Sequence, residues 1–265
     1  MRHTSKWQGY WADLSTDDFA NLPEDTIAIL PLGATEQHGP HLPLSVDTTL
    51  TDAVLAQSRS HWSSDTHALI LPTLAVTKSN EHMAQAGTLS LSVRTLLAML
   101  DDIGASVARA GVKRLMMLNG HGGNTALLEI AVRELRVAHG LITAHASWFG
   151  FSEIEGLVDP ADAAHDLHGG DIETSAMLAV RPDHVDMSKA PNSQPKSRLW
   201  QENLRWTGLN GQAARPGWVI ADLQGSGVCG NASAATRDKG EAMLSSAARN
   251  FAAFLAEFST FEPAA

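Results

Sequence analysis

Cysteine and tyrosine are nearly absent from this chain of 265 residues, which contains one of each. Cys229 has no partner for a disulfide within the chain, and a reducing cytosol is the compartment that fits. Basic residues are also scarce, because 19 Lys and Arg stand against 29 Asp and Glu, for a net charge of −10. This balance argues against binding to nucleic acid and against docking on an anionic membrane surface. We therefore expect a cytoplasmic protein.

Long apolar runs are missing as well. No stretch reaches the roughly 18 uninterrupted apolar residues of a membrane helix, and residues 1–8 contain no apolar signal core. Apolar residues nevertheless make up 44% of the chain, which is enough for a sizeable core. We find no internal repeat and no convincing boundary, so we expect a single domain over residues 1–265.

Polar side chains of one chemical kind follow the first strong apolar run. That run begins at Thr26, has the length of a buried strand, and is broken by Gly33. Carboxylates and imidazoles come next, and these are ligands of divalent metals such as zinc, manganese and iron. Because open α/β sheets bind their ligands at the carboxyl ends of strands, this stretch is a candidate metal site. A simple polar loop is the competing interpretation. The residues concerned are Glu36, His38, His41 and Asp47.

The remaining chain alternates between strand and helix patterns. Strands are expected at 68–71, 114–118 and 141–146, and helices at 47–57, 92–110, 124–138, 171–180 and 234–258. The alternation predicts an α/β fold with a mostly parallel central sheet and helices on both faces. Residues 1–25 contain a helix start near Ser15 and are expected to pack over the sheet edge. The long connection 181–232 is expected to be a lid or an oligomer contact.

Further candidate site residues follow the later strands. In Asn119-Gly-His121-Gly-Gly-Asn124, three glycines let the backbone pass close to a ligand. His168 precedes a helix and Glu173 lies in its first turns, where the helix dipole alone also favours a carboxylate. The same alternative holds for Asp47 as a helix cap. Neither a phased GxGxxG nor a GxxxxGK[ST] motif occurs, so nucleotide-binding folds are excluded.

Taken in order, these motifs resemble the creatininase family of creatinine amidohydrolase-like metal hydrolases. The resemblance is carried by residues 35–44 with Asp47, by 119–124, and by His168-x4-Glu173-Thr-Ser, and it spans about residues 6–258. It implies a three-layer α/β/α fold and a site for two divalent metals (zinc, manganese or iron). It also implies a homo-oligomer, usually a hexamer built as a trimer of dimers.

The resemblance also implies a ligand set, carried over position by position. Glu36, Asp47 and His121 match the ligands of one metal. His38 matches a ligand of the second metal, and Asp47 matches the bridge between the two. Glu173 matches an acid that would complete the second metal.

Other positions receive supporting or catalytic roles by the same resemblance. His168 matches the family's catalytic histidine, which would protonate the leaving nitrogen or steady the oxyanion. Glu81 and His82 are expected behind the ligands or at the substrate. Trp148 is expected to contribute an aromatic wall to the substrate pocket.

One departure from the family pattern concerns Gly122 and Gly123. Creatininases carry Tyr and Glu at these positions, and that Glu is a metal ligand. The second metal therefore has one fewer ligand here unless Glu173 supplies it. The Asn-Gly-His-Gly-Gly-Asn form is similar to relatives that act on other substrates.

We therefore predict a metal-dependent amidohydrolase that cleaves a carbon–nitrogen bond in a small cyclic or formyl amide. One alternative is a peptide-bond hydrolase like the mycofactocin-associated members of the family. Another alternative is a metal-binding scaffold or accessory subunit without turnover. The absence of Glu at position 123 is the feature that supports it. Catalysis by Ser-His-Asp is a poor rival because no Gly-x-Ser-x-Gly elbow occurs.

Overall fold

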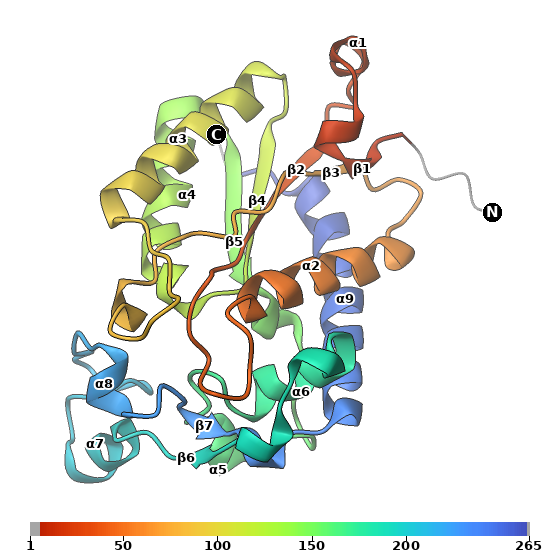
Figure 1. Cartoon of the computed structure of the whole chain (residues 1–265). Coiled ribbons are helices and arrows are strands. Elements are labelled where there is room, and N and C mark those ends of the chain that lie inside the picture. Colours follow the sequence, from red (N-terminus) through yellow and green to blue (C-terminus); the bar gives the residue numbers. More distant parts are fainter. Residues whose placement is uncertain (1–5, 264–265) are drawn as a thin grey trace.

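The computed structural model of this protein describes residues 6–263. Residues 1–5, which begin the stretch without a signal core, lie outside that range, as do 264–265. Five parallel strands form a central sheet in the order β1-β3-β2-β4-β5 (Figure 1). Their bounds are Gln8–Tyr10, Ile27–Leu32, Ala68–Ile70, Arg114–Asn119 and Ile142–Ser147 for β1 to β5. This order puts β2 and β4 side by side, so the candidate ligands that follow each strand meet at one edge.

Helices cover both faces of the sheet. On one face lie α2 (Val46–Ser58), α6 (Asp171–Val180) and α9 (Arg237–Thr260), and on the other lie α3 (Val93–Arg109) and α4 (Thr125–His139). The two faces follow from the alternation of side chains along each strand. In β2, Ile27 and Ile29 join the core under α2 and α9, while Ala28 and Leu30 join the core under α3 and α4. The predicted three-layer α/β/α fold is confirmed.

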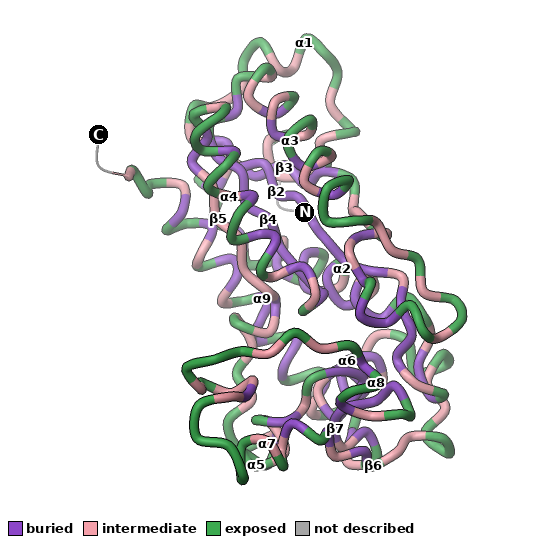
Figure 2. The backbone as a smooth tube through the Cα atoms, turned by 90° about the vertical axis from the view of Figure 1, so that its left-hand side faces the viewer, coloured by how far each residue is buried: buried purple, intermediate pink, exposed green. Residues whose placement is uncertain are grey.

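The centre of the sheet is a rigid base for the loops that follow it. Every residue of β2 and of β4 is buried, and Figure 2 shows this as continuous purple in the middle of the molecule. β2 is apolar throughout and β4 is apolar between Arg114 and Asn119, as expected of strands covered on both faces. The loops after them are therefore fixed at their starting points.

The N-terminal piece differs from its prediction. Residues Gln8–Tyr10 form β1, an edge strand that pairs with β3, and a strand of three residues is too short to show an alternating pattern. The expected helix start at Ser15 is present, with a capping box between Ser15 and Asp18, but α1 ends at Phe19 after one turn.

The long connection folds into several short elements. They are α7 (Ser197–Asn203), α8 (Ile220–Leu223) and a two-stranded antiparallel sheet of β6 (Asn192–Ser193) and β7 (Gly230–Asn231). Figure 1 shows α7 and α8 at the end of the molecule away from α1, near α5 (Pro160–Ala163). Trp200 and Trp218 pack there against a small apolar cluster that includes Cys229. Among residues 6–263, no helix has both the length and the apolar composition needed to cross a membrane.

Candidate metal centre

Two glycines bring the first turn of α2 against the carboxyl ends of β2 and β4. A Cβ at Gly33 would lie 2.5 Å from the Cα of Thr48, and a Cβ at Gly120 would lie 2.5 Å from the carbonyl oxygen of Asp47. Both distances are far below ordinary contact, so these positions require glycine. The close approach puts Asp47 at the strand ends. Ser45 occupies the N-cap position of α2, so Asp47 is not the helix cap.

Six buried side chains from separate segments converge at these strand ends. They form three groups whose possible ligand atoms lie within 4.8 Å of one another. The groups are Glu36, Asp47 and His121; His38, Asp47 and Glu173; and Glu36, His38 and His168. All five residues that the resemblance assigns as ligands, and the histidine that it assigns to catalysis, therefore meet at one place. Their individual roles remain predictions.

The carboxylate of Asp47 lies between the first two groups. Its Oδ1 is 3.2 Å from Nε2 of His38, and its Oδ2 is 3.4 Å from Nδ1 of His121. Glu173 approaches the same nitrogen of His38 at 3.7 Å, and Glu36 approaches the same nitrogen of His121 at 3.1 Å. Each oxygen of Asp47 thus faces a different group, which is the arrangement needed for a carboxylate that bridges two cations.

Unpaired atoms test whether cations fit these residues. Both carboxylate oxygens of Glu36, Nε2 of His38 and Oδ2 of Asp47 are buried and have no hydrogen-bond partner. Buried carboxylate oxygens without a partner are costly, and neighbouring carboxylates repel one another unless positive charge lies between them. The donor set of carboxylates and imidazoles is that of zinc, manganese or iron. The residues present therefore fit one or two divalent cations.

Backbone carbonyls fix the orientation of three imidazoles. A carbonyl oxygen only accepts hydrogen bonds, so the nitrogen facing it carries the hydrogen and the other nitrogen faces the carboxylates. Proteins orient metal-binding histidines in this way. The pairs are His38 Nδ1 with the carbonyl of Glu36 at 3.1 Å, His121 Nε2 with that of Lys78 at 2.9 Å, and His168 Nε2 with that of Gln37 at 2.6 Å.

Neighbouring carboxylates control the protonation of two of these imidazoles. Burial alone would lower the pKa of His38, but Asp47 and Glu173 raise this pKa well above its ordinary value. Burial likewise opposes a charge on His121, whose pKa is raised well above its ordinary value by Glu36 and Asp47. In the absence of a cation, protons on these two rings balance the carboxylate charge.

His168 differs from His38 and His121 in its protonation. Burial, together with the neighbouring His38, lowers the pKa of His168, so this ring is neutral near neutral pH. Its Nδ1 therefore carries a lone pair and lies 3.6 Å from Oε1 of Glu36. This nitrogen can bind a cation or accept a proton.

Two cavities adjoin the cluster. The inner chamber, of about 260 Å³, is lined by Glu36, Asp47 and Glu173 among others. The outer cleft, of about 660 Å³, lies between residues 78–82, 121–126 and 209–218. Both are also lined by His121, Gly122, Leu167 and His168. A substrate in either cavity thus lies next to the candidate ligands.

A family model described as creatininase, creatinine amidohydrolase, matches residues 12–255. This chain belongs to the creatininase family. It is 36% identical over 224 residues to a mycofactocin precursor peptide peptidase of Mycobacterium ulcerans, covering 79% of this chain and 80% of that protein. It is 33% identical over 187 residues to a creatinine amidohydrolase of Pseudomonas putida, covering 64% of this chain and 70% of that protein.

Solved creatininase structures share the fold. A creatinine amidohydrolase (creatininase) superposes with a TM-score of 0.72 at 29% identity, over 97% of this chain and 100% of that one. A creatininase variant described as the Zn-Zn type gives a TM-score of 0.71 at 29% identity, over 96% and 98% of the two chains. A structure described as creatininase Mn gives a TM-score of 0.70 at 28% identity, over 94% of this chain and 97% of that one.

The carboxylate of Glu81 lies where the creatininase pattern has a Glu side chain at position 123. A Cβ at Gly123 would overlap with Oε1 of Glu81, so the carboxylate of Glu81 fills the place of a side chain at position 123. Oε1 lies 3.7 Å from Nε2 of His121, and Oε2 accepts a hydrogen bond from Lys78 at 2.6 Å. A carboxylate from the loop after β3 thus stands where the loop after β4 has none.

Two side chains singled out from the sequence lie away from the candidate ligands of this creatininase-family chain. Trp148 is fully buried in the core, with its ring stacked on Phe149 at 4.1 Å, and it lines neither cavity. The expected aromatic wall is therefore corrected: Phe149 lines the inner chamber, because the large ring of Trp148 is taken up by the core. His41 turns to Thr174, whose Oγ1 lies 2.9 Å from its Nε2, and joins none of the three groups.

Asp166 is a site residue that the sequence analysis missed. It lines the inner chamber, and burial raises the pKa of its carboxyl to about 7. Its Oδ2 accepts the backbone N–H of Ile172 at 3.0 Å, and its carboxylate packs against the backbone of Gly170 and Gly230. The signal in the sequence is an acid two residues before His168, ahead of the Gly169-Gly170 pair.

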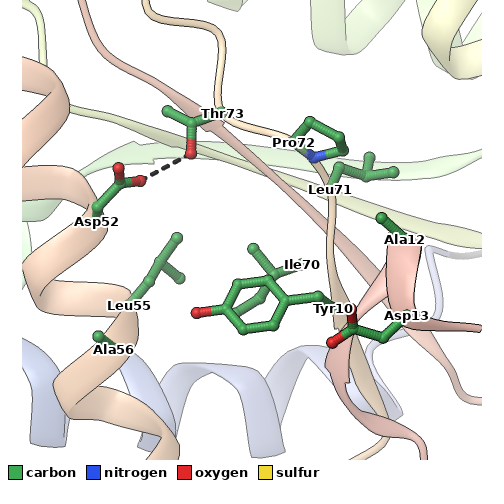
Figure 3. A pocket seen from close by; sticks show the side chains of 10 residues that line it. All are labelled: Tyr10, Ala12, Asp13, Asp52, Leu55, Ala56, Ile70, Leu71, Pro72 and Thr73. Atoms are coloured by element: carbon green, nitrogen blue, oxygen red, sulfur yellow. Dashed lines mark hydrogen bonds between the residues drawn. The ribbon is translucent and has the colours of Figure 1, made fainter.

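A separate cleft of about 490 Å³ lies beyond the carboxyl ends of β1 and β3 (Figure 3). Tyr10, Leu55 and Ile70 line it, and Thr73 donates a hydrogen bond to Asp52 at 2.7 Å. Within residues 6–263, none of the three possible metal-binding groups includes a residue of this cleft. We assign no chemistry to it.

Proposed function

We propose that this creatininase-family chain is a metal-dependent hydrolase that cleaves a peptide bond in a short peptide. The observation that supports an extended substrate is the outer cleft of about 660 Å³, which runs past the candidate ligands. Gly122 and Gly123 line it without side chains. The similarity to a mycofactocin precursor peptide peptidase, 80% of whose length is matched, supports a peptide substrate over other amides.

The candidate ligands supply a charged, buried place for cations. Glu36, Asp47 and His121 would hold one cation, and His38, Asp47 and Glu173 would hold a second. When bound, such cations activate a water molecule for attack and polarise the amide carbonyl. The carboxylates lie in a water-poor interior, where electrostatic contacts with the reacting groups are strong.

His168 would move the proton during amide cleavage. Its Nδ1 carries a lone pair directed at the cluster, so it can accept a proton from the attacking water. Once protonated, the same nitrogen can deliver that proton to the leaving nitrogen of the amide. Free imidazole titrates near neutral pH, and burial lowers the pKa of His168 from that value, which favours the neutral ring that accepts the proton.

The walls of the outer cleft suit a polar chain. Lys78, which is paired with Glu81, and Arg215 supply cations, Glu129 supplies an anion, and Trp218 adds an apolar surface. A peptide presents carbonyl oxygens to such cations and side chains to such a ring.

A small cyclic or formyl amide is the second candidate. The inner chamber of about 260 Å³ favours it, since a chamber of that size holds a small molecule but not an extended peptide. Creatinine itself is expected to be a poor substrate, because the Tyr and Glu that creatininases carry are replaced here by Gly122 and Gly123.

A screen with reconstituted protein tests this proposal. Protein stripped of metal and reloaded with zinc, manganese or iron is incubated with short peptides, creatinine and formylated aminopyrimidines, and products are identified by mass spectrometry. We expect metal-dependent peptide cleavage that chelation abolishes. An Asp13→Ala variant in the separate cleft should retain it.

Other outcomes discriminate between the candidates. Cleavage of a formyl or cyclic amide without peptide cleavage would move the assignment to the second candidate. Full metal loading without turnover of any of these substrates would favour the scaffold interpretation instead.

A further inference from the structure

The side-chain amide of Gln37 is fixed in one orientation. The backbone N–H of Gly39 donates to its Oε1 at 3.0 Å, and its Nε2 donates to the carbonyl of Gly227 at 2.9 Å. A backbone N–H only donates and a carbonyl oxygen only accepts, so these two contacts settle which end of the amide is the nitrogen.

This orientation determines the tautomer of His82. The amide nitrogen of Gln37 lies 3.0 Å from Nδ1 of His82, within hydrogen-bond distance of its second hydrogen. Nδ1 must accept that hydrogen bond, so the proton of the His82 ring is on Nε2. His168 Nε2 also lies 3.1 Å from the same amide nitrogen, but its own hydrogen is given to the carbonyl of Gln37.

His82 therefore differs in kind from the other imidazoles around the cluster. His38, His121 and His168 turn their carbonyl-bound nitrogen outward, whereas His82 turns an N–H inward. This N–H lies 3.9 Å from Oε1 of Glu36, too far for a hydrogen bond, and within residues 6–263 it has no acceptor. An N–H directed inward cannot bind a cation, and His82 is in none of the three ligand groups among the described residues.

The position of His82 suits a hydrogen bond to a substrate. It lines the outer cleft beside His121 and His168, and its ring packs on that of His168 with centroids 4.1 Å apart. The ring is buried and held from behind by Gln37, so the N–H is aimed before a substrate arrives. Donors fixed in this way stabilise developing negative charge without reorganisation.

We propose that Nε2–H of His82 donates a hydrogen bond to the oxygen of the scissile amide carbonyl as negative charge develops on it. This inference rests on the proposed amide hydrolysis. It separates two tasks that the family resemblance gives to His168 alone. His168 offers a lone pair and moves the proton, while His82 offers an N–H and steadies the oxyanion.

The first test reads the tautomer directly and needs no substrate. Two-bond proton–nitrogen correlation spectra of the zinc-loaded protein show which ring nitrogen of each histidine carries hydrogen, and a His82→Gln variant assigns the His82 signals. We expect hydrogen on Nε2 of His82. Hydrogen on Nδ1 would overturn the proposal.

The second test uses acetohydroxamate, a small metal chelator with an amide-like oxygen. Its affinity for the zinc-loaded protein is measured by calorimetry for the wild type, His82→Ala and His82→Gln. We expect binding about tenfold weaker in His82→Ala. His82→Gln, which keeps an N–H donor, should recover most of the affinity. The exposed His61→Ala serves as the matched control.

Metal content separates a donor from a ligand. Elemental analysis should find unchanged zinc in His82→Ala and His82→Gln, and loss of zinc would show that His82 is a ligand. Unchanged acetohydroxamate affinity in His82→Ala would also overturn the proposal. With a substrate in hand, His82→Ala should lower kcat by about 100- to 1,000-fold with little change in KM. Failure of the substrate screen alone would leave the tautomer and chelator results standing, so the two proposals fail separately.

Discussion

Glu81 and Gly123 share one space at the edge of the candidate metal centre. The carboxylate of Glu81 overlaps the position that a Cβ at residue 123 would take, and it remains 3.7 Å from Nε2 of His121. A carboxylate at this place can come from the loop after β3 or from the loop after β4, but not from both. The glycine that departs from the creatininase pattern is thus matched by an acid elsewhere in the chain.

We therefore expect Gly123→Glu to damage the protein by itself. Overpacking typically costs about 1–3 kcal/mol, and at this half-buried position the new side chain would push Glu81 away from His121. Thermal unfolding and zinc content should both fall. The double variant with Glu81→Gly should recover part of both losses, because it returns a single carboxylate to the space. A Cβ at position 123 would still lie 2.3 Å from Nε2 of His121, so the recovery should be incomplete.

Gly122→Ala is the matched control for this pair, since a Cβ at Gly122 meets no atom within 4 Å. It should leave unfolding and zinc content unchanged. If the double variant is as damaged as the sum of the two single changes, Glu81 and residue 123 do not substitute for each other.

Asp47 is predicted to bridge the two cations. Asp47→Ala should strip metal and abolish hydrolysis together, because one side chain faces both ligand groups. Elemental analysis and a turnover assay measure the two effects. Asp52→Asn on the same helix, which lies in the separate cleft, should keep its metal. Full metal occupancy in Asp47→Ala would reduce Asp47 to a residue favoured only by the start of the helix.

Metal uptake should release protons. Without a cation, the pKa values of His38 and His121 are raised well above their ordinary value, so both rings hold a proton at neutral pH on the nitrogen that faces the carboxylates. A cation must displace these protons. Metal affinity should therefore increase as pH rises toward the raised pKa values and weaken as pH falls.

Calorimetry in two buffers of different ionisation enthalpy counts the released protons. We expect a net release at pH 7 in the wild type. The release should decrease in His38→Ala. Equal heats in the two buffers would mean that these imidazoles are already unprotonated before the cation binds.

The oligomeric state is predicted from the family resemblance to be a closed homo-oligomer, usually a hexamer. The connection 181–232, which we expect to be a lid or an oligomer contact, contains three tryptophans. Trp206 is 61% exposed, whereas Trp200 and Trp218 pack within the chain. Trp206→Glu should therefore shift the assembly toward smaller species, because interfaces are enriched in aromatic residues. Val137→Glu on the exposed face of α4 is the control. Light scattering that gives the monomer mass of 28.3 kDa for the wild type would contradict the prediction.

The sequence predicted the sheet because its central strands contain apolar runs, six residues in β2 and residues 115–118 in β4. β2 and β4 are buried on both faces and have a clear pattern, while β1 has three residues and none. The meeting of Glu36 and His121 followed from the same reasoning, since parallel strands end at one edge. The order of β2 beside β4 was not readable from either strand alone.

Contacts between loops that are distant along the chain could not be predicted from the sequence. Gln37 reaches Gly227, 190 positions away, and no local pattern indicates that pairing. The tautomer of His82 depends on it. Trp148 was misjudged for a related reason, because an aromatic residue after a strand looks the same whether it faces the core or a cavity.

The three outward imidazole contacts end on carbonyls of the main chain, at Glu36, Gln37 and Lys78. A point substitution changes a side chain but leaves its carbonyl in place, so mutational scanning at these acceptors should leave ring orientation intact. Insertion or deletion of one residue would move the carbonyls themselves. Away from Gly33, the candidate ligands and the side chains that contact them, the loop at 33–47 and the loop at 76–82 should therefore tolerate exchange of amino acids better than any change in length.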